Sequence, residues 1–290
     1  MENAACLPFA AVAEARGGRD VPEAAPALWA AGTLECLALP TIAVVGTRAA
    51  TEYGRRLART FAAELGAAGC CIVSGLALGI DAAAHLGALD AGAPTAGVLG
   101  GGHRAFFPKR NRPLAERMLQ QGGLVLSPFA PDEPARPGQF LARNGIVAAL
   151  ADAVVVIEAP ARSGALNTAG WAAGRIPVFA VPGDVDRPHV AGCHALIRDG
   201  AILARSAQDV LDDLRLTSRR KGRGPKHQAT AAVSDPLQRR LVEALGSGEQ
   251  SLDDLCSRVN APPAQILAAI AFLEMGDVVE PRAGRRYVLR

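Results

Sequence analysis

Short runs of apolar residues alternate, through most of the chain, with segments in which apolar residues recur every three or four positions. The runs have the length of buried strands, and the recurring segments have the period of a helix. Leu57, Phe61 and Leu65, for example, lie one helical turn apart. The pattern predicts strands at residues 42–46, 70–74, 95–99, 124–127, 153–158, 177–181 and 201–203. It predicts helices at residues 52–68, 80–91, 112–121, 140–150, 165–173, 194–198 and 207–214.

Strands that alternate with helices predict an α/β domain with a parallel sheet, here at residues 41–214. Residues 1–40 are expected to form an N-terminal extension. The pattern changes at residues 234–290, where three helices are followed by two short strands around residues 281–285. Three helices and a hairpin are typical of the winged-helix variant of the helix-turn-helix.

Composition narrows the class of protein. Half of the 290 residues are apolar, yet no apolar run approaches the ~20 residues that span a bilayer. The apolar run at residues 4–13 has no basic segment before it, so a secretory signal is not expected. The six cysteines have no C-x-x-C spacing, which argues against a structural zinc site and favours a reducing cytoplasm.

Charge is distributed unevenly along the chain. Residues 1–214 carry a net charge of −2, whereas residues 215–290 carry +5. Residues 215–226 hold six cations and no acid, among glycines and a proline. Residues 215–233 therefore have the composition of a basic flexible linker. This linker could attract phosphate groups through its positive charge, or it could be only a solvated hinge between two domains.

Glycine follows five of the predicted strands. The segments are Gly46-Thr47-Arg48, Ser74-Gly75 up to Asp81, Gly100-Gly101-Gly102, Arg162-Ser163-Gly164 and Pro182-Gly183-Asp184. Ligands of open parallel sheets bind beyond the carboxyl ends of the strands, where helix N-termini attract anions. We therefore expect a cleft that faces phosphate, with glycines that serve only packing as the alternative.

Common nucleotide fingerprints and catalytic sets are missing. The chain has neither G-x-G-x-x-G after the first strand nor G-x-x-x-x-G-K-[ST] anywhere. Asp81 and His85 lie four residues apart on a helix, where a surface hydrogen bond is the simplest interpretation. Glu158 is the best single carboxylate for chemistry, but it has no evident partner. We expect no catalysis, no cofactor and no metal.

Several of these motifs together resemble the DprA/Smf family of DNA-processing proteins. They are the segments at residues 46–48, 74–81 with His85, 140–144, 158–159 with 163–164, and 178–183. The resemblance covers residues 26–214. Two positions depart from the family pattern: Gly145 replaces an arginine, and residues 190–194 replace a Ser-x-Gly-x-Asn segment.

The resemblance implies an extended Rossmann-like domain that binds single-stranded DNA largely without sequence preference and protects it. It also implies a cytoplasmic homodimer that loads the RecA recombinase onto incoming DNA during natural transformation. A C-terminal winged-helix domain is common in the family, whereas a further N-terminal helical domain is not expected in this chain.

The expected DNA-binding residues follow from the motifs and the strand-end loops together. Phosphates would be neutralised by Arg48, by Arg143, and by Lys109 or Arg110. Arg136 could replace the positive charge that is lost where Gly145 stands instead of an arginine. Phe140 is either a platform for one base or an ordinary core residue. The full expected set is Gly46, Thr47, Arg48, Ser74, Gly75, Lys109, Arg110, Asn111, Arg136, Phe140, Arg143, Asn144, Ser163 and Gly164.

Three questions about function stay open. The first is the role of the winged helix: its third helical segment, residues 263–275, has no Lys or Arg, which favours an accessory or protein-contact role over reading of duplex DNA. A nucleotide-hydrolysing Rossmann enzyme is a second possibility, although Pro182-Gly183 continues as Asp-Val-Asp rather than with the P-G-G-x-G-T signature. A winged-helix transcription regulator is a third, and the absence of Lys and Arg from the same helix counts against it.

Overall fold

The computed structural model describes residues 4–17, 25–216, 235–246, 248–275, 278–282 and 286–289. The chain divides into two compact units, Met1–Arg220 and Lys221–Arg290. Most of the segment expected as a basic linker, from residue 217 onward, lies outside the described residues, as does Arg285.

One nine-stranded sheet forms the centre of the first unit, in the order β1-β2-β6-β5-β4-β3-β7-β8-β9. The strands β3 to β9 run parallel to one another. They are β3 Thr41–Val45, β4 Cys71–Ser74, β5 Thr95–Val98, β6 Leu124–Ser127, β7 Ala153–Val156, β8 Val178–Ala180 and β9 Ile202–Leu203. This arrangement confirms the predicted α/β class with a parallel sheet.

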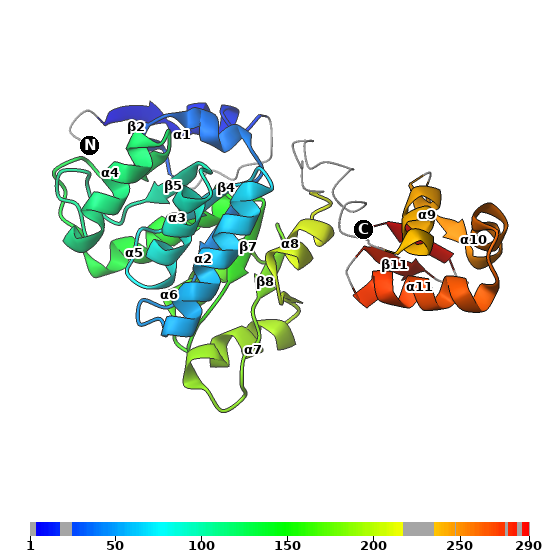
Figure 1. Cartoon of the computed structure of the whole chain (residues 1–290). Coiled ribbons are helices and arrows are strands. Elements are labelled where there is room, and N and C mark those ends of the chain that lie inside the picture. The colour runs from blue at the N-terminus through cyan, green and yellow to red at the C-terminus, as the bar shows by residue number, and fades with distance from the viewer. Residues whose placement is uncertain are drawn as a thin grey trace. The chain divides into compact units, whose positions relative to one another are not determined.

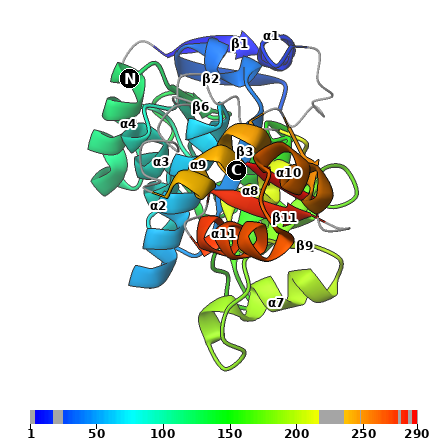
Figure 2. The same cartoon turned by 45° about the vertical axis from the view of Figure 1, so that its right-hand side comes forward.

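Helices cover both faces of this sheet, because alternate residues of each strand point to opposite sides. On β3, Ala43 and Val45 face one apolar cluster, whereas Ile42 and Val44 face the other. The first cluster includes α5 Pro137–Ala149, α6 Gly164–Ala172 and α7 Ala191–Arg198. The opposite face is covered by α2 Glu52–Ala67, α3 Ile80–Asp90, α4 Arg112–Gln120 and α8 Ala207–Asp213. Figures 1 and 2 show α2 and α3 side by side on that face.

The strand order places a switch point between β3 and β7. From β3 the chain builds β4, β5 and β6 to one side, then returns to add β7, β8 and β9 to the other. The loops that follow β3 and β7 therefore diverge and leave a crevice at the carboxyl ends of these strands.

The segment expected only as an N-terminal extension contributes to the sheet. It forms β1 Ala5–Pro8, α1 Phe9–Glu14 and β2 Ala27–Gly32, and β2 pairs antiparallel with β6. Figure 2 shows both strands at one edge. Arg16, only 1% exposed, donates to Asp152 Oδ1 at 2.6 Å and to the Leu150 carbonyl. The apolar runs at residues 4–13 and 27–31 are visible in the sequence, but the partner of β2 is β6, more than 90 residues further along the chain, and local pattern does not show such a pairing.

The second unit has a separate core. Its elements are α9 Pro236–Leu245, β10 Gln250–Ser251, α10 Leu252–Val259, α11 Pro263–Met275, β11 Val279–Arg282 and β12 Arg286–Leu289. The strands form an antiparallel sheet in the order β10-β12-β11. Leu241, Leu255, Ile266, Ile270 and Tyr287 pack together beneath it. The predicted winged-helix architecture is confirmed.

Candidate functional site

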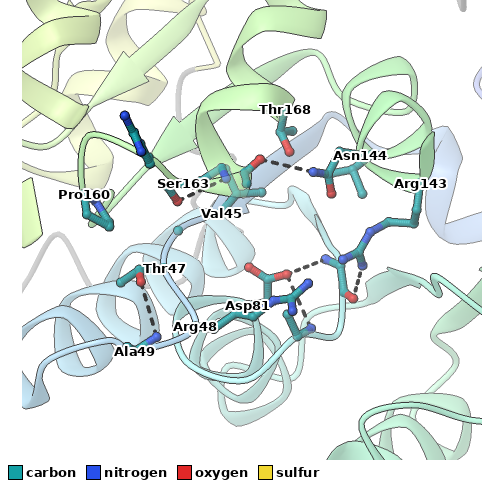
Figure 3. A pocket seen from close by; sticks show the side chains of 17 residues that line it. Val45, Thr47, Arg48, Ala49, Asp81, Arg143, Asn144, Pro160, Ser163 and Thr168 are labelled. Carbon is teal, nitrogen blue, oxygen red and sulfur yellow. Dashed lines mark hydrogen bonds between the residues drawn. The ribbon is translucent and has the colours of Figure 1, made fainter. Parts of the chain in front are cut away.

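A pocket of about 290 Å³ lies at the switch point of the sheet. The loops after β3, β4 and β7 form its walls, and the middle of α5 adds Arg143 and Asn144 (Figure 3). Eight of the expected DNA-binding residues line this pocket: Gly46, Thr47, Arg48, Gly75, Arg143, Asn144, Ser163 and Gly164. Sequence spacing alone suggests a cleft along five strand ends, and the tertiary structure concentrates these residues around three of them, the ends of β3, β4 and β7, together with α5.

Close backbone packing explains two glycines of the pocket. A Cβ at Gly46 would lie 2.5 Å from Ile80 Cγ1 and 2.8 Å from the Glu158 carbonyl oxygen. A Cβ at Gly75 would fall on the guanidinium of Arg143. Both glycines let backbone approach a neighbour that any larger residue would displace.

Arg143 and Asp81 hold the loop between β4 and α3 from opposite sides. Arg143 Nη1 donates to the carbonyls of Gly75 and Val98, the latter at 2.6 Å. Asp81 Oδ2 accepts from the backbone N–H of Gly75 at 3.1 Å and of Ala77 at 3.4 Å (Figure 3). Arg143 is 3% exposed, so it places positive charge beneath the pocket rather than a free guanidinium in it.

Burial changes the acidity of both groups. It lowers the pKa of Arg143 to about 10, against the opposing attraction of Asp81. Burial also raises the pKa of Asp81, against the opposing effect of Arg143. Arg143 therefore remains cationic at neutral pH. Two carbonyls engage its Nη1 while the side chain still lines the pocket, so binding of phosphate by its other N–H groups stays a prediction.

Ser74 and Asn111, expected among the ligand contacts, instead support the backbone. The hydroxyl of Ser74 is fully buried and donates to the Val44 carbonyl at 2.7 Å. Asn111 Nδ2 donates to the carbonyls of Leu76 at 2.9 Å and Ala77 at 3.0 Å. These side chains face inward because backbone polar groups at the ends of buried strands require partners.

The N-terminus of α6 forms one wall of the pocket. Ser163 caps the helix, since its Oγ accepts from the Ala165 N–H at 3.3 Å. Asn144 Nδ2 donates to the Gly164 carbonyl at 3.1 Å and so joins α5 to this turn. The nine-residue helix directs its positive end toward the pocket, where the first N–H groups favour an anion.

Five exposed cations lie on the segments that form this region and its margin: Arg48, Lys109, Arg110, Arg136 and Arg162. Arg48 and Arg162 line the pocket, whereas the other three lie within four residues of Phe107 or Phe140 in the chain. Within the described residues, none of the five takes part in an ion pair. Elsewhere on the first unit, Arg59, Arg104, Arg117 and Arg205 are each paired with an aspartate, whereas the exposed Arg56, Arg175 and Arg198 are separate cations that take part in no ion pair among the described residues. We call the pocket together with these five cations the strand-end site.

Arg162 was not among the expected residues, although it directly precedes Ser163 and Gly164. The sequence could have indicated Arg162 as a binding residue, because it is a cation at the start of a glycine-containing loop that follows a predicted strand. It lines the pocket in the structure.

Phe140 lies beside the pocket and is half-buried. The Arg48 guanidinium carbon lies over its ring, 4.7 Å from the centroid. Phe107, a residue that sequence reasoning missed, is 51% exposed and packs against the same ring with centroids 6.0 Å apart and planes at 57°. Arg48, Phe140 and Phe107 thus form a continuous row from the pocket outward.

The groups considered for chemistry are engaged structurally. Glu158 accepts from the N–H of Thr51 at 3.0 Å and from its hydroxyl at 2.5 Å, so it braces the start of α2. His85 does not pair with Asp81; its Nδ1 bonds Thr95 Oγ1 at 2.7 Å inside the protein. In the described part of the chain, no three His, Cys, Asp or Glu side chains gather as metal ligands, and no helix is long and apolar enough to cross a membrane.

Several arginines on the described surface of the second unit have partners within that unit. Arg240 and Arg258 donate to the carbonyls of Val259 and Ala244. Arg286 Nε donates to Glu249, and Arg282 lies 3.4 Å from Glu280. The α11 helix exposes Leu267 and Phe272 rather than cations.

Comparison with known proteins agrees with this architecture. The family model described as DNA recombination-mediator protein A matches residues 15–215, and a DprA winged helix domain model matches residues 225–285. A DprA homologue of Mycobacterium tuberculosis is 42% identical over 269 residues, covering 91% of this chain and 68% of the relative.

Two solved structures are similar at the level of both fold and sequence. The X-ray structure of DNA processing protein A from Streptococcus pneumoniae has a TM-score of 0.65 and 36% identity, covering 73% of this chain and 75% of that chain. DNA processing protein A from Helicobacter pylori, whose structure is described in terms of its single-stranded DNA binding mode, has a TM-score of 0.61 and 30% identity, covering 68% and 94%. The chain therefore belongs to the DprA family of DNA-processing proteins.

Proposed function

We propose that this protein binds single-stranded DNA at the strand-end site, largely without sequence preference. The observation that carries the proposal is the group of five exposed cations without acidic partners around a pocket at the switch point. Arginine and lysine in such a place attract phosphates, and the N-terminus of α6 adds backbone donors. The single-stranded DNA binding described for the Helicobacter pylori relative supports the same assignment.

Weak sequence preference follows from the kinds of groups present. Cations, backbone N–H groups and aromatic rings contact phosphates and base faces, which all nucleotides share. Of the expected residues, Gly46, Thr47, Arg48, Gly75, Lys109, Arg110, Arg136, Phe140, Asn144, Ser163 and Gly164 remain in the proposed interface, with Arg162 added. Ser74, Asn111 and Arg143 support it from beneath.

We further propose that the protein acts as a homodimer in the cytoplasm, protects the strand and loads the RecA recombinase onto it during natural transformation. The edge strand β9 supports dimerisation, since Ile202 and Leu203 are 39% and 44% exposed beside unpaired main-chain groups. Six unpaired cysteines suit a reducing compartment. Measurement of the molar mass in solution tests the homodimer. The RecA interaction is tested by capture of RecA, which we expect from the DNA-bound protein but not from a variant whose dimer is disrupted.

Titration of a labelled oligothymidine at several salt concentrations tests the central proposal. Each phosphate neutralised on a single strand contributes about −0.7 to the slope of log K against log salt, so five engaged cations predict roughly −3.5. Unlabelled single strands should displace the probe far better than duplex of the same length. Equal displacement by duplex would instead favour a duplex-reading regulator, and release of base from nucleoside monophosphates would favour a hydrolase.

A further inference from the structure

Phe107 is a large apolar side chain held in solvent, in the short segment between β5 and α4. Half of its surface is exposed, whereas its neighbour Phe106 is 3% exposed and packs with Leu99 and Met118. Exposure alone does not distinguish Phe107, because Trp171 and Phe272 are exposed to a similar extent. Its contact with Phe140, whose ring lies under the Arg48 guanidinium, places it next to the strand-end site.

The backbone that carries Phe107 is anchored on both sides. Before it, His103 Nε2 donates to the Val125 carbonyl at 3.0 Å, and the Gly102 N–H donates to the Glu133 carbonyl at 2.8 Å. After it, Asn111 holds the turn to the loop between β4 and α3. The ring is therefore presented in a fixed place, so that little conformational entropy is lost when a ligand stacks on it.

Phe140, the aromatic residue expected to stack on a base, is already occupied. The Arg48 guanidinium lies over its ring at 4.7 Å, and Phe107 packs against it. The backbone of Gly100 approaches so closely that a Cβ there would lie 2.6 Å from Phe140 Cδ1. Such a cation–π contact orients the guanidinium and leaves little of the Phe140 ring for a ligand.

Lys109 and Arg110 follow Phe107 closely and are exposed without ion pairs in the described part of the chain. Bases and phosphates alternate along a single strand of DNA. The ring of Phe107 could contact a base, and Lys109 and Arg110, two and three residues later, could contact the phosphates next to it. The pocket, Arg48, Phe140 and Phe107 form one row, so a strand whose phosphate lies at Arg48 reaches this segment next.

We propose that Phe107 is the platform on which an unpaired base stacks, that Lys109 and Arg110 neutralise the phosphates beside that base, and that Phe140 is a positioning residue for Arg48. This inference rests on the proposed binding of single-stranded DNA at the strand-end site. It extends that site from the pocket along the segment between β5 and α4.

The test uses two oligomers of equal length, one of thymidines and one with abasic positions throughout. The two carry the same phosphates but differ in bases. Phe107→Ala in the full chain should bind the thymidine oligomer on the order of tenfold more weakly than wild type, and the abasic oligomer equally well. Its salt slope should equal that of wild type, whereas Lys109→Ala should flatten the slope by about 0.7.

Three further variants make the result specific. Phe107→Trp should restore base-dependent binding, and Phe107→Leu should restore only part of it while keeping an apolar side chain on the segment. Phe140→Ala should flatten the salt slope, because Arg48 loses its support, and should retain the preference for base-bearing DNA. Trp171→Ala is the matched control, since Trp171 is 54% exposed on α6 and does not line the pocket.

The outcomes separate the inference from the function on which it rests. If wild type binds neither oligomer at low salt, the proposed function is wrong. If wild type binds with the expected slope but Phe107→Ala and Phe107→Leu match it on both oligomers, only the platform is wrong. An equal loss on both oligomers, or a loss of base preference in Phe140→Ala instead, would also overturn the assignment.

Discussion

At the scale of single residues, Arg48 is the cation on which the proposed site depends most. It lines the pocket and is oriented by Phe140. We expect Arg48→Ala to weaken binding of oligothymidine and to flatten the salt slope by about 0.7. Arg198→Ala is the matched control, because Arg198 is also exposed but lies on α7 outside the site. Unchanged affinity and slope in the Arg48 variant would remove this residue from the interface.

Gly75 tests whether the loop after β4 depends on close contact with Arg143. A methyl group there would displace a buried guanidinium that two carbonyls hold, and overpacking of this kind costs about 1–3 kcal/mol. We expect Gly75→Ala to lower the free energy of unfolding in urea by that amount. Gly170→Ala, in open space within α6, should leave stability equal or slightly higher. Equal stability of both variants would contradict the packing argument.

His85 makes stability depend on pH. Burial lowers its pKa to about 3, far below the unfolded value of 6.5. Its Nδ1–H donates to Thr95, whose hydroxyl in turn donates to the Ile72 carbonyl, and Nε2 is buried without a partner among the described residues. Between these two pKa values the unfolded state binds more protons, so stability falls as pH falls below about 6.5.

This contribution should amount to about 1.4 kcal/mol for each pH unit within that window. The measurement is urea unfolding at pH 7.5, 6.5 and 5.5 for wild type and His85→Gln. The difference between the two proteins should shrink as the pH falls. A difference that stays constant would show that His85 titrates normally in the folded protein.

At the scale of elements, the segment from β1 to β2 acts as an integral edge of the sheet. Phe9, Val12 and Leu28 are almost fully buried, and each such side chain contributes roughly 1.5–3 kcal/mol. We expect deletion of residues 1–32 to lower the melting temperature sharply, because it also uncovers the edge of β6. A truncated protein with the melting temperature of the full chain would mean that the segment is only an extension.

At the scale of the whole molecule, the strand-end site is complete within the first unit. The pocket residues and the five cations all precede residue 215, and the second unit packs around its own core. We expect a chain that ends at residue 233 to retain most of the affinity for oligothymidine. A chain that ends at residue 214 additionally lacks the basic segment 215–226. A flatter salt slope in the shorter chain alone would assign phosphate contacts to that segment.

Local sequence was sufficient for the parallel sheet and for the strand-end location of the site. Apolar runs such as residues 153–156 have the length and β-branched composition of central strands, and the glycines that follow them are typical of turns at one edge of the sheet. The winged helix was equally evident, because its helices begin at capping residues such as Ser251. These features depend on neighbours within a few residues.

Long-range packing decided which of the expected residues are free to bind. Arg143, Ser74 and Asn111 are polar residues of the expected motifs, but carbonyls of neighbouring strands and of the loop after β4 accept hydrogen bonds from them. Phe107 and Arg48 meet through Phe140 although they come from three separate segments of the chain. The polar or aromatic character of a residue is local, whereas its hydrogen-bond partners and its exposure depend on chain segments far away in sequence, and only the folded protein specifies those.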